Sequence, residues 1–151
     1  MIGFYNVLEQ IKDTLGAEPF VNTITYGNID DVDLNKQNIF PLSHIIVNNT
    51  TIQERVLTFN ISVLAMDVVD ISKDETTNIF RGNDDEQDIL NTQLAVLTRL
   101  SSILKRGTLY DNKYQLDGDV VCEPFVDRFE NKIAGWTGTF SIIVQNDMTI
   151  C

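Results

Sequence analysis

The side chains that most often carry catalysis are scarce in this sequence. His44 is its single histidine, which excludes a metal site or an acid–base pair that needs two histidines. It follows Ser43 at the start of an apolar run, a placement that favours a strand-end histidine bonded to the backbone over a catalytic one. The motifs of phosphate-binding loops, dinucleotide-binding folds, helical zinc proteases and serine-hydrolase elbows are absent. A Ser-His-Asp triad stays open, because its members meet only in the fold, but nothing in the sequence favours it.

One acidic motif partly matches a calcium loop. Asp31, Asp33 and Asn35 stand at the first three ligand positions of an EF-hand. The match then fails, because Lys36 replaces the glycine of the sharp turn and Leu42 replaces the bidentate glutamate. The motif therefore favours a solvated acidic loop over a cation site.

A second acidic stretch, between residues 67 and 86, permits three interpretations: a solvated loop, a carboxylate metal site for hydrolysis, or an assembly surface. A long loop is a poor place for metal ligands, which rigid elements usually hold. Ile79 and Phe80 favour the assembly surface, since a solvated linker has no need of large apolar side chains. On this hypothesis the interface residues are Ile71, Ile79 and Phe80, and the acids at a rim or in a lumen are Asp67, Asp70, Asp74, Glu75, Asp84 and Asp85.

Length and charge bound the remaining possibilities. The 151 residues, 43% of them hydrophobic, predict one domain over 1–151 with long acidic loops at about 27–38 and 67–85. The net charge of −11 argues against a protein that coats duplex DNA or docks on an anionic membrane. The sequence contains neither a transmembrane run nor a signal-peptide pattern. Two cysteines, Cys122 and Cys151, are too few for a disulfide framework, and we expect both to be free thiols.

The first half of the chain predicts a helix followed by a hairpin. Apolar residues at helical spacing indicate a helix from Phe4 to Leu15, with Gly16 as a left-handed C-cap. A short strand on 20–26 follows. Two alternating strands then predict an antiparallel hairpin whose turn lies at 48–50. On its second strand Leu57, Phe59, Ile61 and Val63 face one way, and Thr58, Asn60 and Ser62 the other.

The second half predicts a long helix and further strands. A broad apolar stripe indicates a helix from about Asp84 to Arg106, capped by Asn83, that packs across a sheet. Its expected buried face is Leu90, Leu94, Leu97, Leu100 and Leu104. Pro124 marks an edge strand, residues 129–133 lead into a turn, and 135–144 form a strand with Trp136, Phe140, Ile142 and Val144 on one face. Together the elements predict an α+β fold: an antiparallel or mixed β-sheet with a short N-terminal helix and a long helix packed across one face.

This order of elements resembles a family of virion proteins. A short helix precedes a proline-led strand, FPLSHIIV at 40–47, and a long alternating strand from Arg55 to Met66 follows. An acidic loop then leads to a helix, and GWTGTFSIIV at 135–144 closes the sheet. The order is similar to that of the tail-terminator and tail-completion proteins of tailed bacteriophages and related neck ring proteins, over most of the chain.

The resemblance implies a structural role without enzymatic activity or cofactor. Such proteins form homo-oligomeric rings, here a hexamer or a dodecamer, that cap the tail tube or join it to the head connector. The implied partners are other neck, connector or tail-tube proteins, with DNA only in passage and no membrane; the implied location is the virion, after synthesis in the host cytoplasm. A negative lumen suits such a role, because like charge keeps DNA sliding. The loops at 27–38 and 67–85 are long for a minimal member, which leaves a different neck component open.

Two other classes of function remain open at this point. One is a small carboxylate-dependent metal hydrolase that uses Asp67, Asp70 or the acids near Asp31. The other is a protein-binding adaptor unconnected with any virus. A measurement of the size of the assembled particle would distinguish the ring-subunit hypothesis from both of these alternatives.

Overall fold

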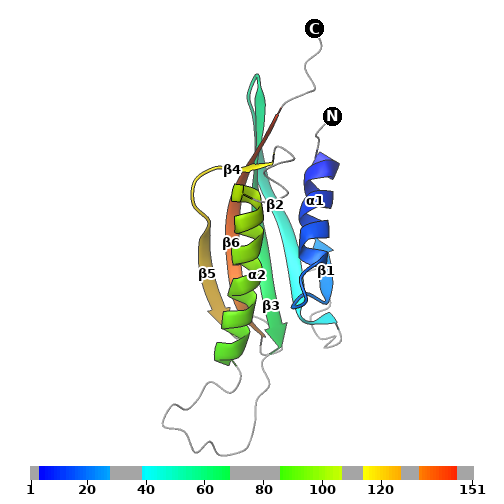
Figure 1. The fold of residues 1–151 in the computed structure, drawn as a ribbon, viewed down its shortest axis with the longest axis vertical. Helices are drawn as coiled ribbons and strands as arrows, with labels where there is room; N and C mark the ends of the chain where they lie inside the picture. Colours follow the sequence, from blue (N-terminus) through cyan, green and yellow to red (C-terminus); the bar gives the residue numbers. More distant parts are fainter. Residues whose placement is uncertain (1–3, 28–38, 69–85, 107–113, 127–132, 146–151) are drawn as a thin grey trace, which may run out of the picture.

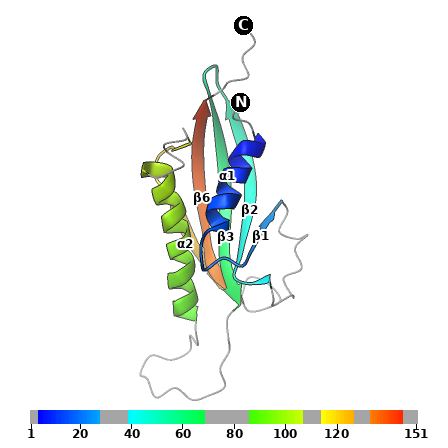
Figure 2. The same ribbon diagram turned by 45° about the vertical axis from the view of Figure 1, so that its right-hand side comes forward.

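Two helices cover one face of a six-stranded sheet (Figures 1 and 2). This computed structural model describes residues 4–27, 39–68, 86–106, 114–126 and 133–145. The elements are α1 (Phe4–Gly16), β1 (Thr23–Tyr26), β2 (Leu42–Ile52), β3 (Val56–Val68), α2 (Glu86–Arg106), β4 (Gln115–Leu116), β5 (Val121–Val126) and β6 (Ile133–Gln145). The predicted α+β class, with both helices packed on the sheet, is confirmed.

The two longest strands form the centre of the sheet. β3 and β6 pair antiparallel along their whole length, from Val56 opposite Gln145 to Val68 opposite Ile133. β2 joins β3 as the predicted hairpin, and β1 adds to β2 as the one parallel pair. β4 and β5 both pair with β6 at its other side, so β1 and β5 lie at opposite edges. Pro124 is in the edge strand β5, as predicted, where a residue without an N–H is tolerated.

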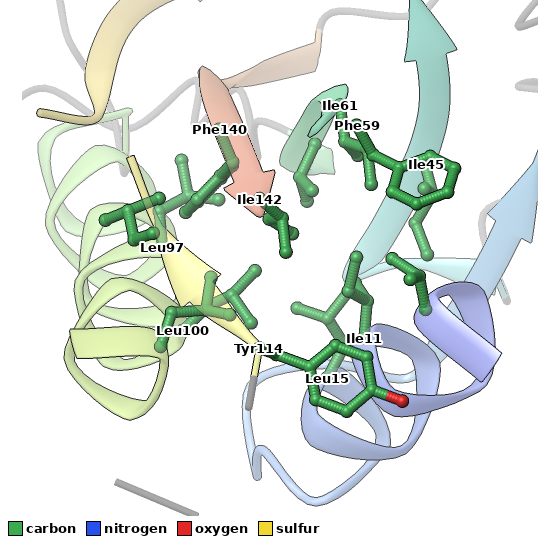
Figure 3. Packing of buried hydrophobic residues seen from close by; sticks show 14 of the residues in the cluster. Ile11, Leu15, Ile45, Phe59, Ile61, Leu97, Leu100, Tyr114, Phe140 and Ile142 are labelled. Carbon is green, nitrogen blue, oxygen red and sulfur yellow. The ribbon is translucent and has the colours of Figure 1, made fainter. Parts of the chain in front are cut away.

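Alternation along the central strands builds the main core (Figure 3). The four β3 residues predicted to share a face are buried, and the alternate residues of β6 join them beneath the helices. α1 contributes Val7, Ile11 and Leu15 to the same cluster. In Figure 3 side chains from both helices point toward Phe140 and Ile142 of β6. The alternation of apolar and polar residues in the sequence therefore decides which face of the sheet packs against the helices.

The end of α1 differs from the expectation. Gly16 is the last helical residue, but the glycines with positive φ in the described chain are Gly27 and Gly118. In place of a left-handed cap, the Ala17 N–H donates to the Asp13 carbonyl and the Glu18 N–H to the Leu15 carbonyl. The helix thus ends in a tightened turn, which satisfies carbonyls that a glycine cap would otherwise serve.

α2 packs across the sheet as predicted, but it is rotated relative to the expected face. Leu97, Leu100 and Leu104 are buried, whereas Leu90 and Leu94 are half-buried. The other buried residues are Ile89, Gln93 and Val96. Ile89 and Val96 belong to the predicted apolar stripe, whereas the polar Gln93 does not. The Trp136 indole N–H donates to the Leu90 carbonyl at 2.8 Å and ties this end of the helix to β6. The predicted cap Asn83 lies outside the described residues.

The predicted turn at 48–50 is wrong. β2 runs through it to Ile52, and the hairpin closes at residues 53–55, where the Gln53 N–H donates to the Val56 carbonyl. The register shifts between Val47 and Asn49, so Asn48 is the extra residue of a β-bulge. Asn-Asn-Thr suits a turn or a bulge equally well, and only the partner strand decides between them.

Two further boundaries also change. Asp67 and Val68 belong to β3, not to a linker, because they pair with β6. Ile133 is the first residue of β6, not the approach to a turn. Of the loops predicted at about 27–38 and 67–85, residues 28–38 and 69–85 lie outside the described residues, as do the calcium-like motif and Cys151. Cys122 is a free thiol.

Candidate functional site: the open face of the sheet

His44 is a structural residue. Its Nε2 lies 2.8 Å from the Gly27 carbonyl oxygen, which can only accept, so Nε2 carries the proton. Nδ1 then accepts from the Thr25 hydroxyl at 2.6 Å. Both contacts tie β2 to β1, and the side chain is fully buried. The predicted backbone-bonded histidine is confirmed.

Burial lowers the pKa of His44 below its usual 6.5, and the hydrogen bond to Gly27 offsets part of this effect. As the pH falls from about 7.5 to about 5.5, the unfolded chain therefore binds a proton that the folded chain excludes, so stability should fall. Urea midpoints of the native protein and of His44→Gln, which retains a donor and an acceptor, measure this effect. We expect the native protein to lose stability relative to the variant over this range. Parallel pH profiles would contradict the assignment.

The sheet face turned away from the helices carries a network of uncharged polar side chains. The Ser141 hydroxyl donates to Asn60 Oδ1 at 2.7 Å, and Asn60 Nδ2 donates to Asn49 Oδ1. Beside them, Asn48 Nδ2 donates to the Ser62 hydroxyl at 2.8 Å. The bulge makes the Asn48–Ser62 contact possible, because the extra residue puts both Asn48 and Asn49 on this face. We call this surface, on Asn48, Asn49, Thr58, Asn60, Ser62, Thr139 and Ser141, the open face; its side chains are half-buried or exposed.

Among the described residues, no lysine or arginine lies on a strand of the open face. The six strands contain two charged residues, Asp67 and Glu123, and both are acidic. Glu123 is exposed opposite Thr137, on the side of the open face, whereas Asp67 pairs with Ala134 on the helix side. The lysines and arginines of the described chain lie on the helices or in the hairpin turn: Lys12, Arg55, Arg99, Lys105 and Arg106.

The same side of the sheet is apolar and sealed at one end. Leu42, Leu64 and Met66 are at most 5% exposed there and pack with Phe40 and Ile133. The sequence signal for this second cluster is the consecutive run 63–66, where alternation breaks because both faces of β3 are buried. A buried apolar cluster therefore bounds the polar residues of the open face at one end of the sheet.

Most residues of the predicted assembly surface lie outside the described chain. Asp67 is the exception: it is in β3, and its carboxylate accepts from the Val68 N–H at 2.8 Å. Ile71, Ile79, Phe80 and the other five acids are not placed. The sequence prediction therefore missed the surface that the structure does describe. Its signal was available in the polar alternate positions of 58–62 and 137–141, two runs that contain no Lys or Arg.

Among the described residues, no cluster of three or more His, Cys, Asp or Glu side chains could hold a metal ion. Neither described helix is long and apolar enough to cross a membrane. Comparison of the chain with protein families and with curated proteins finds no match.

Proposed function

We propose that the chain is a ring-forming structural subunit of a tailed-bacteriophage neck or tail, a tail terminator or head–tail joining protein. In this role it caps the tail tube or links it to the connector and lets DNA pass. The observation that carries the proposal is the open face, where polar side chains stand among Ile46, Ile143 and Val121 and no strand has a lysine or arginine. The likeness of element order to the tail-terminator family supports the same role.

The chemistry of the open face suits contact with passing DNA. Lysine and arginine bind phosphates and release counterions, and each such contact adds affinity that a translocating duplex must then break. Hydroxyl and amide side chains already bonded to one another, as in the Asn49–Asn60–Ser141 chain, offer fewer free donors to phosphate. A net charge of −11 adds repulsion at longer range. The open face would line the hole, and the helices would face outward.

Both edges of the sheet offer surface for a neighbouring subunit. Tyr26 on the β1 edge is 55% exposed, and Tyr5 beside it on α1 is 81% exposed. Val121 on the β5 edge is 61% exposed. Large apolar side chains exposed at two different edges suit a head-to-tail contact, in which one edge meets the other and the rotation closes a ring.

The size of the assembled particle tests this function. Native mass spectrometry and negative-stain microscopy of the chain, alone and mixed with the products of neighbouring genes, should show one closed ring of six or twelve copies. A chain that remains monomeric at all concentrations and in all mixtures would contradict the proposal. So would a metal-dependent hydrolysis that Asp67→Asn abolishes.

A further inference from the structure

A groove of about 440 Å³ separates α2 from the chain that enters β5. Leu94, Val120 and Cys122 form its apolar part, and each is half-buried. Hydroxyl side chains of α2 form the rim, and Lys105 is the one charged side chain among the described lining residues. We call it the α2–β5 groove. Its apolar side chains would gain free energy from an occupant that covers them.

We propose that residues 69–85 of a neighbouring copy occupy this groove, with Ile79 and Phe80 on its apolar part. The inference rests on the proposed ring, in which every subunit has a neighbour on each side. The segment contains two features that match the groove. It has adjacent large apolar residues, and its acids outnumber Lys73 and Arg81, which complements Lys105.

The reach of the chain limits where the subunit's own Ile79 and Phe80 can lie along the groove. Phe80 is six residues before Glu86, so its Cα lies at most about 21 Å from the start of α2. Lys105 is nineteen residues into the helix, about 28 Å from that start. The subunit's own apolar pair therefore stops short of Lys105 but can reach Leu94, about 12 Å into the helix, so the cross-link must distinguish this pair from that of a second copy.

The native Cys122 thiol in the groove permits a direct test by cross-linking. Phe80→Cys in a Cys151→Ser background supplies the second thiol, and the assembled particles are oxidised and run on a denaturing gel. Burial raises the pKa of the Cys122 thiol, so oxidation is carried out at about pH 8.5. We expect a ladder of covalent oligomers that disappears when Cys122→Ser is added.

The outcomes separate this inference from the proposed function. Assembled rings that give no cross-link, or only a compact cross-linked monomer, would overturn the occupant and leave the ring standing. A chain that forms no ring under any condition would overturn both.

A charge variant provides a second test if Phe80→Cys itself prevents assembly. Lys105→Glu should raise the concentration for half-assembly about fivefold, because it removes the cation that meets the acidic segment. Arg55→Glu makes the same change in net charge in the turn between β2 and β3, where the native residue is exposed and lies on neither edge strand. It should shift assembly less than about twofold. Equal shifts for the two variants would overturn the proposal.

Discussion

Gly135→Ala should lower the free energy of unfolding by at least about 3 kcal/mol. Gly135 lies on β6 opposite Met66 of β3, at the sealed end of the sheet. A Cβ there would be 2.1 Å from the Ala65 carbonyl oxygen and 2.8 Å from the Met66 Cα. These are backbone atoms of the neighbouring central strand, so they can move only if the two strands separate. The added methyl group would therefore weaken the pairing between β3 and β6.

Gly138→Ala is the matched control on the same strand. Its Cβ would meet Leu97 Cδ1 and Phe140 Cε2, each at 3.1 Å. Both atoms are at the ends of side chains that can shift by a few tenths of an ångström, so we expect a loss of about 1 kcal/mol. Urea unfolding of the three proteins measures the difference. A Gly135→Ala variant as stable as Gly138→Ala would show that the strands are not packed as described.

Leu97→Ala should cost roughly 2–5 kcal/mol, the range for a large side chain removed from a core. Leu97 is 1% exposed and lies over Gly138, where the missing side chain of β6 leaves room for it. Its removal leaves a cavity between α2 and the sheet that the rigid strands cannot fill. Leu94→Ala, at a half-buried position three residues earlier, should cost about 1 kcal/mol. A loss below about 0.5 kcal/mol for Leu97→Ala would mean that α2 presents another face to the sheet.

The elements that depend on local periodicity could be predicted from the sequence. The alternation of 57–63 and of 136–144 sets which residues meet the helices, and the apolar stripe of α2 sets its approximate face. Pairings that depend on distant partners could not be predicted. The Asn48 bulge and the parallel β1–β2 pair each require knowledge of the neighbouring strand. Gln93 shows the same limit within a helix, because a buried polar residue interrupts the pattern that marks the core.

The candidate site shows the same difference between features visible in a local stretch of sequence and features that depend on distant residues. The acidic stretch at 67–86 could be identified from the sequence because the charge of each residue is known from its type. The open face is a property of three adjacent strands, and it becomes visible only when Asn49, Asn60 and Ser141 are seen to lie side by side. Likewise, the α2–β5 groove joins residues from 94–105 with residues from 120–122, which no local pattern connects.

Electron cryo-microscopy of the assembled ring would show which surface lines the hole. We expect β3 and β6 to line it through Asn60, Ser62, Thr139 and Ser141, with α1 and α2 on the outside. A hole lined by the helices, with their lysines and arginines, would overturn the proposed function, as would an assembly without a hole.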